Sequence, residues 1–363
     1  MDDPNTSLSL SIEDIHNLFD NSSNYTDWFG YNDSFVVDPK TFTCPETHIA
    51  QSVNIAMCLL YWLIFLLAVP GNILVAIVIG LNKHSLTPSD IYLFHLSVAD
   101  TLFALTIPFW AVSTIQGWVF GDSMCKLVSL VQEINFYSSV LFLVCISIDR
   151  YLAIVRALQT RKQRQPLHSW AVCISVWLLG AVLGLPVLFN EAFKPLNSDK
   201  EVCYENYDPQ SGDQWRLFTR LLRHMLGFLI PLIIMLICYS ITICRLLETR
   251  SFQKQKAMKV IVAVVIAFLL CWMPYHLTVI VDTLIRYEII FSNCNTRNII
   301  DLALFATQSL GLLHSCVNPV LYAFVGEKFR KNLLNLLYKM RLLDRTSVSK
   351  ISRSTSQSSD IIM

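Results

Sequence analysis

The chain has 363 residues, of which 54% are hydrophobic and only 15% charged, and its mean hydropathy is +0.48. This balance excludes an ordinary soluble domain and indicates a membrane protein. The net charge of +1 gives no reason to expect nucleic acid as a partner.

Residues 1–48 form an acidic tail with nine acids and one base, Lys40. The tail is rich in Ser and Asn and lacks helical periodicity, which favours a segment that stays disordered until something binds it. It has no basic start followed by an apolar core, so we expect the first spanning segment to direct insertion. Four Asn-x-Ser/Thr sequons predict glycosylation and an extracellular location; they begin at Asn5, Asn21, Asn24 and Asn32.

Seven stretches within residues 49–326 are long and apolar enough to cross a bilayer as helices. Their approximate cores are Ile55–Ile79, Ile91–Ala111, Leu127–Ile148, Trp170–Phe189, Met225–Cys244, Val260–Val281 and Leu302–Val325. Nineteen of the 28 Lys and Arg residues fall on one side of these spans, which predicts that this side is cytoplasmic. The fold class expected is therefore all-α, a bundle of seven spanning helices. No internal repeat relates its halves, which argues against an inverted-repeat transporter.

Two segments follow the last span. Residues 327–343 place apolar residues such as Phe329 and Leu333 among basic ones, the pattern of a helix that lies on membrane lipids. Residues 344–363 are rich in Ser and Thr and are typical of a kinase substrate, with a low-complexity linker as the alternative. The candidate phosphorylation sites are Ser352, Ser354, Thr355, Ser356, Ser358 and Ser359.

Asp100 is the only acid near the middle of the second predicted span. A carboxylate there requires a proton, an ion or a polar cluster to offset its desolvation. Polar residues in other apolar stretches are candidate partners: Asn72, Asn135, Ser139, His314 and Asn318. We hypothesise that Asp100, Asn135, Ser139 and Asn318 hold an allosteric sodium ion, because a small hard cation prefers oxygen ligands. The alternative is a protonated Asp100 that only joins helices. No other cofactor is expected.

Prolines interrupt five of the predicted spans, at Pro108, Pro186, Pro231, Pro274 and Pro319. Each removes a backbone donor and loosens the helix about one turn upstream, which leaves a place to bend. Trp272-Met273-Pro274 and Asn318-Pro319 set a bulky or polar side chain beside such a point, and we interpret both as hinges.

A set of short motifs, each in its own span, resembles class A G-protein-coupled receptors. The motifs are Gly71-Asn72, Leu96 to Asp100, Asp149-Arg150-Tyr151, Trp177, Cys271 to Pro274, and Asn318-Pro319 to Tyr322. Further features resemble chemokine receptors: Thr106 to Pro108, Trp118 to Gly121, Asp149 to Val155, Cys44 and Cys294. Three segments resemble the CXC interleukin-8 receptors most, namely Asp100 to Pro108, Phe136 to Val155 and His314 to Phe324. The resemblance covers residues 50–335. Two residues depart from it, Gln308 where chemokine receptors commonly carry Glu, and Gln132 where the interleukin-8 receptors have Lys.

The resemblance implies a multi-pass plasma-membrane receptor that binds a basic CXC chemokine of the Glu-Leu-Arg type, such as interleukin-8. Such a receptor activates an inhibitory-class heterotrimeric G protein, drives leukocyte chemotaxis, and has receptor kinases and arrestin as further partners. It also implies the disulfides Cys125–Cys203 and Cys44–Cys294. The residues implied in activation and G-protein coupling are Asp149, Arg150, Tyr151, Tyr239, Trp272, Pro274, Asn318, Pro319 and Tyr322.

Charged and aromatic residues expected on the outer face complete the candidate ligand site. The acidic tail should capture a basic ligand body, and basic residues near the spans should read the ligand's N-terminus. The ligand-binding candidates are Tyr25, Asp27, Tyr31, Trp110, Glu133, Arg216, Arg220, Asp282, Arg286, Arg297 and Gln308. For any single one of these arginines, the alternative is a helix end anchored at the headgroups.

Two other functions agree less well with the sequence. An enzyme finds little support, because the chain lacks the common hydrolase, metalloprotease and phosphate-binding motifs, and we expect no catalytic residues. A non-signalling chemokine scavenger is the nearer alternative, but the intact Asp149-Arg150-Tyr151 disfavours it.

Overall fold

The computed structural model describes residues 51–81, 86–155, 166–195, 199–207, 211–249, 252–291 and 293–325, with residues 329, 330, 332–334 and 336. All of these belong to one compact unit, Glu46–Met363. The elements are α2 (Gln51–Gly80), α3 (Pro88–Ala104), α4 (Ile107–Gln116), α5 (Gly121–Val155), α6 (Pro166–Gly184), η4 (Leu185–Phe189), β1 (Asn190–Phe193), β2 (Val202–Glu205), α7 (Gly212–His224), η5 (Met225–Leu229), α8 (Ile230–Thr249), α9 (Phe252–Arg286), α10 (Cys294–Leu312) and α11 (His314–Val325).

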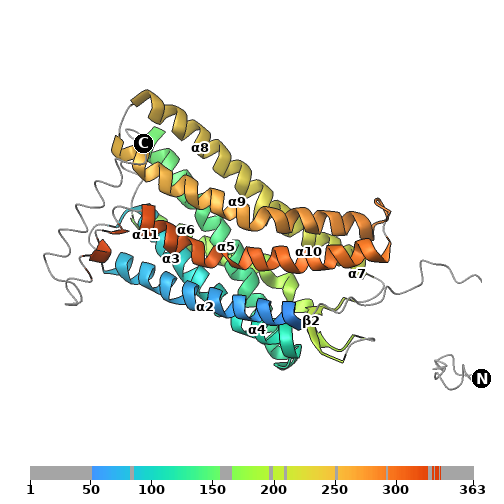
Figure 1. Cartoon of the computed structure of the whole chain (residues 1–363). Helices are drawn as coiled ribbons and strands as arrows, with labels where there is room; N and C mark the ends of the chain where they lie inside the picture. The colour runs from blue at the N-terminus through green and yellow to red at the C-terminus, as the bar shows by residue number, and fades with distance from the viewer. Residues whose placement is uncertain are drawn as a thin grey trace, which may run out of the picture. The chain divides into compact units, whose positions relative to one another are not determined.

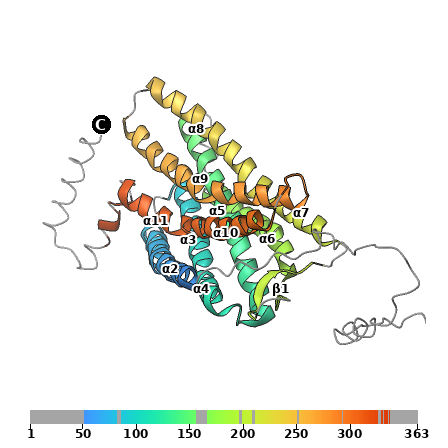
Figure 2. The same cartoon turned by 45° about the vertical axis from the view of Figure 1, so that its right-hand side comes forward.

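Seven spanning segments are found in the described chain, which confirms the predicted fold class. They are Gln51–Gly80, Pro88–Gln116, Gly121–Val155, Leu167–Phe189, Gly212–Arg245, Val265–Arg286 and Cys294–Leu321. The helices run side by side, with the strand β2 at one end of the bundle and α11 at the other (Figures 1 and 2). The long helix α5 packs against α3, α6 and α8 and so occupies the middle of the bundle. Leucines such as Leu66, Leu178 and Leu270 face outward, as expected for a surface covered by lipid.

The second and seventh spans are each two helices, where the sequence predicted one. The second span breaks at Leu105 and Thr106, between α3 and α4. Pro108 explains this break. It has no N–H to donate a helical hydrogen bond to the carbonyl of Ala104, four residues earlier, and its ring clashes with that carbonyl. The seventh span breaks at Leu313, between α10 and α11.

A side chain replaces a backbone bond in the seventh span. Pro319 has no N–H to offer the carbonyl of Ser315, four residues earlier. Asn72 of α2 donates from Nδ2 to that carbonyl at 2.7 Å. Because α2 satisfies the acceptor that Pro319 leaves free, the irregular helix is tied to its neighbour at this point.

Prolines also change the fourth and fifth spans. The fourth ends in the 3-10 turn η4, which contains Pro186. The fifth contains the π-helical turn η5, which ends two residues before Pro231. The fifth span also begins at Gly212, thirteen residues before the predicted core. The prediction began too late because α7 contains many polar residues, which do not resemble a membrane-spanning segment.

The bundle carries a two-stranded hairpin that the sequence did not predict. Strands β1 and β2 are antiparallel, with Ala192 opposite Cys203. After the seventh span, the described residues of 327–343 are helical, which agrees with the predicted membrane-surface helix, and Phe329 packs against the bundle core.

Candidate functional site

A cavity of about 420 Å³ lies among the helices next to the hairpin. Its walls come from α2, α3, α4, α5, α7, α9 and α10 and from both strands. Aromatic side chains form much of the lining, namely Tyr61, Phe103, Trp110, Phe136, Tyr204, Trp272, Tyr275 and Phe305. Its charged and amide groups are Gln132, Glu133, Asn190, Glu205, Arg220, Arg223 and Gln308. An apolar cavity with a few polar groups is the usual form of a ligand site.

The structure places four of the predicted ligand-binding residues on this wall: Trp110, Glu133, Arg220 and Gln308. Three others, Arg216, Asp282 and Arg286, form ion pairs beside it. Arg297 is exposed on α10 and is absent from the cavity wall.

Asp282 of α9 joins two arginines at the edge of the cavity. Its Oδ2 lies 2.7 Å from Nη1 of Arg220 and 2.9 Å from Nε of Arg286. The side chain of Asp282 is only 7% exposed. A third arginine, Arg216, lies 3.6 Å from Glu205 of β2. The edge of the cavity therefore carries both positive and negative side chains, and each of these side chains already forms an ion pair within the protein.

A second ion pair lies on the cavity wall and was missed by the sequence reasoning. Arg223 of α7 donates from Nε and Nη2 to the two carboxylate oxygens of Glu133 on α5, at 3.0 and 2.8 Å. Its Nη1 donates to the hydroxyl of Tyr275 on α9 at 2.9 Å. The sequence did contain a signal, since a carboxylate such as Glu133 inside a span requires a cation. Arg223 was overlooked because it precedes the predicted core of the fifth span.

The residues that follow these two on α7 and α9 are also in contact. His224 and His276 bring their Nδ1 atoms to 2.7 Å. Two consecutive residues of α7 thus bond to two consecutive residues of α9, and this contact lies immediately after Pro274.

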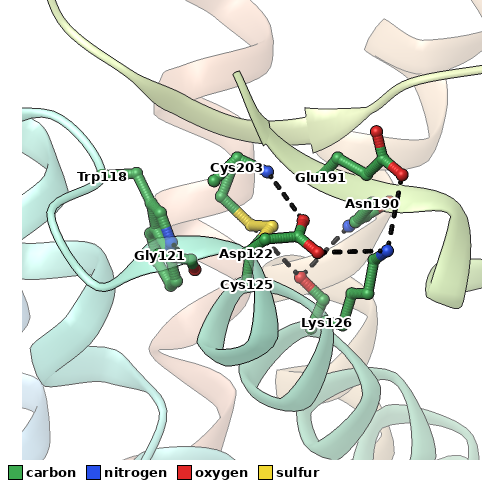
Figure 3. The surroundings of a disulfide bond; sticks show 10 residues. Trp118, Gly121, Asp122, Cys125, Lys126, Asn190, Glu191 and Cys203 are labelled. Carbon is green, nitrogen blue, oxygen red and sulfur yellow. Dashed lines mark hydrogen bonds and ion pairs between the residues drawn. A yellow bond between two sulfur atoms is a disulfide. The ribbon is translucent and has the colours of Figure 1, made fainter. Parts of the chain in front are cut away.

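A disulfide fixes the hairpin to the head of α5 (Figure 3). Cys125 and Cys203 are bonded, which confirms the first implied bridge. Asp122 accepts from the backbone N–H of Ala192 at 3.2 Å, and Lys126 forms ion pairs with Asp122 and with Glu191 of β1. Because Cys203 also lines the cavity, this cluster holds one wall in place.

Trp272 lies deep in the cavity wall against a glycine. Its ring centroid is 4.8 Å from that of Phe136. A Cβ added to Gly311 of α10 would lie 3.0 Å from Cζ3 of the indole. The absence of a side chain at Gly311 therefore allows α10 to pack directly on Trp272, two residues before the hinge at Pro274.

Asp100 lies in the middle of the bundle with two of its predicted partners. Its carboxylate accepts from Ser139 Oγ at 3.0 Å and from Asn318 Nδ2 at 2.7 Å. The amide oxygens of Asn318 and of Asn135, one turn before Ser139, are buried without a partner within the described part of the chain. A carboxylate whose partner Asn318 carries an unpaired amide oxygen fits the ligand preference of a small hard cation.

Four of the predicted coupling residues, Asp149, Arg150, Tyr151 and Tyr239, lie at the end of the bundle away from the cavity, whereas Trp272 is part of the cavity wall and Asn318 contacts Asp100. Ser89 donates to Asp149, and the hydroxyls of Ser147 and Tyr239 are 2.6 Å apart, which joins α5 to α8. Nε of Arg150 is buried and has no hydrogen-bond partner among the described residues. Tyr151 follows on the last turn of α5. For Tyr322 the structure describes only the backbone, which is helical in α11.

Several predicted sites lie outside the described residues. They are the tail residues Tyr25, Asp27 and Tyr31, the four sequons, the candidate phosphorylation sites and Cys44. Cys294, the implied partner of Cys44, is disulfide-bonded.

The family model of the 7 transmembrane receptor (rhodopsin family) matches residues 71–322. The chain is 45% identical to the C-X-C chemokine receptor type 2 of Oryctolagus cuniculus over 336 residues, which cover 91% of this chain and 93% of the relative. It is 45% identical to the type 1 receptor of the same species over 317 residues, 86% of this chain and 88% of the relative. With the type 2 receptor of Homo sapiens it shares 46% identity over 295 residues, 81% of each chain.

Proposed function

Because the chain belongs to the rhodopsin family of 7 transmembrane receptors, and within it to the C-X-C chemokine receptors, we propose that it binds a basic CXC chemokine outside the cell and activates an inhibitory-class G protein inside. Membership of this family and the seven spanning helices make it a multi-pass plasma-membrane protein and a receptor. The N-terminus is extracellular and the C-terminus cytoplasmic in this proposal. The downstream result is leukocyte chemotaxis.

The observation that carries the proposal is the pairing of two sites in one bundle. A cavity with a disulfide-anchored wall lies at one end. At the other end Arg150 keeps buried donor capacity beside the contact between α5 and α8. An arginine stays charged and offers five donors, so it can exchange partners when a G protein binds. Ligand and G protein that favour the same conformation raise each other's affinity.

The ligand is read in two steps. The acidic tail, including Asp27, Tyr25 and Tyr31, captures the basic chemokine body through long-range attraction that salt screens. The ligand's N-terminus then enters the cavity edge. If it carries Glu-Leu-Arg, its Glu binds the arginines of the edge and its Arg binds Asp282.

The polar cluster around Asp100 suggests a sodium ion as an allosteric ligand. Asp100, Asn135, Ser139 and Asn318 would hold it, and its charge would offset that of the buried carboxylate. The unpaired amide oxygens support this assignment.

The remaining partners follow from the tail and the family. We propose that receptor kinases phosphorylate the Ser/Thr-rich tail, that arrestin binds it afterwards, and that residues 327–343 lie on membrane lipids. The scavenger alternative would bind chemokine without promoting nucleotide exchange.

A radioligand competition panel across the CXC chemokines, with nucleotide exchange measured in the same membranes, tests the proposal. Deleting residues 1–38 should weaken binding and flatten its salt dependence. Asp282→Asn should impair exchange more than capture. Binding without exchange in the wild type would select the scavenger, and binding by no chemokine would refute the proposal.

A further inference from the structure

Three arginines follow one face of α7 at a spacing of four and three residues: Arg216, Arg220 and Arg223. This spacing places them one above another along a helix. Each is paired with an acid from a different element, Glu205 of β2, Asp282 of α9 and Glu133 of α5. They form a ladder of cations that leads from the edge of the cavity to its interior.

The ion pairs of these arginines differ in what remains when a ligand carboxylate binds the arginine in place of its own acid. Asp282 contacts two arginines, so it keeps Arg286 when Arg220 is lost. Among the described residues, Glu133 hydrogen-bonds only to Arg223, and its side chain is 14% exposed. A carboxylate that took Arg223 alone would leave Glu133 charged and unpaired, which is strongly unfavourable.

We propose that the deep pair is an exchange site for the N-terminus of a protein ligand, whose α-ammonium binds Glu133 while a nearby ligand carboxylate binds Arg223. This inference rests on the proposed function. Charge is conserved in the exchange, since each protein ion loses one partner and gains another. A ligand tip that carries only one of the two charges leaves an uncompensated ion and binds less well.

The exchange also has a consequence for the hinge. Arg223 donates to Tyr275, which directly follows Pro274. When Arg223 turns to a ligand carboxylate, α5, α7 and α9 lose their common polar contact. The ligand's dipolar tip thereby loosens α9 at its weakest backbone position.

The experiment uses full-length receptor in membranes and human interleukin-8 as the probe, with a free or an acetylated α-amino group. Acetylation removes the cation that the exchange requires, so it should lower affinity for the wild type by about tenfold. Glu133→Gln/Arg223→Gln removes both protein ions together and should bind the two forms with equal affinity. Tyr275→Phe keeps the ion pair and should retain the full effect of acetylation, with raised ligand-independent exchange.

Surface expression provides a second reading. Glu133→Gln alone leaves Arg223 unpaired and should reduce the amount of receptor at the surface, while the double variant should restore it. An equal effect of acetylation on the wild type and the double variant would overturn the exchange, and so would a double variant no better expressed than the single one. Failure of interleukin-8 to bind the wild type would count against the proposed function itself and would remove the exchange with it.

Discussion

Replacing Gly311 by Ala tests the contact between α10 and Trp272. The new Cβ would lie 3.0, 3.1 and 3.2 Å from Cζ3, Cε3 and Cη2 of the indole, closer than carbon atoms approach without repulsion. The indole has little room to retreat, because the tilted ring of Phe136 packs against it with the ring centroids 4.8 Å apart. Overpacking of this kind costs about 1–3 kcal/mol. The better helix propensity of Ala returns about 1 kcal/mol, so the observed conformation should lose up to about 2 kcal/mol.

The assay is thermal unfolding of the purified full-length receptor, with ligand-independent nucleotide exchange as a second readout. Gly80→Ala is the matched control, because Gly80 is also a helical glycine and no atom lies within 4 Å of its added Cβ. Gly311→Ala should lower the melting temperature relative to Gly80→Ala and should raise basal exchange, since conformations in which Trp272 has moved gain population. Equal melting temperatures and equal exchange in the two variants would refute the steric argument.

Three further outcomes are expected. Asp100→Asn should make agonist affinity insensitive to sodium in competition binding, and a sodium dependence like that of the wild type would contradict the sodium site. Cys203→Ser breaks the disulfide bridge to Cys125. Such a loss costs about 2–5 kcal/mol in small domains but less here, because lipid confines the helices. Chemokine binding should fall in this variant, whereas Cys58→Ser, at a free cysteine, should leave binding intact. Arg150→Ala should preserve chemokine binding and surface level yet abolish nucleotide exchange, and normal exchange would show that this arginine does not couple to the G protein.

The spanning segments were predictable because their signal is local. A run of apolar residues of bilayer length has few alternatives to a spanning helix. The contact of Asp100 with Ser139 and Asn318 was also predictable, because isolated polar groups in apolar spans must find one another.

The breaks, the hairpin and Arg223 were harder to predict for a different physical reason. A proline shows that a helix is weakened, but neighbouring helices decide whether it bends, tightens or ends, as the different outcomes at Pro108 and Pro274 show. The role of Arg223 depends on the direction in which α7 faces, and this direction is set by the π-helical turn η5 that follows. Pro231 marks a weak point just after that turn, but a proline alone does not show that the helix widens to a π-helical turn there.

The turn η5 changes the direction in which the side chains of α7 face relative to those of α8, the second half of the fifth span. An α-helix turns about 100° per residue, so a π-helical turn, which accommodates one extra residue, lets α7 and α8 face independent directions. If this turn closed to a regular α-helix with every residue retained, α7 would rotate by about that angle relative to α8, with Arg223 and His224 carried away from α9. Substitutions that decide whether this short segment is π-helical or α-helical are therefore a route by which related chains could change what the cavity recognises while the opposite end of the helix keeps its contacts.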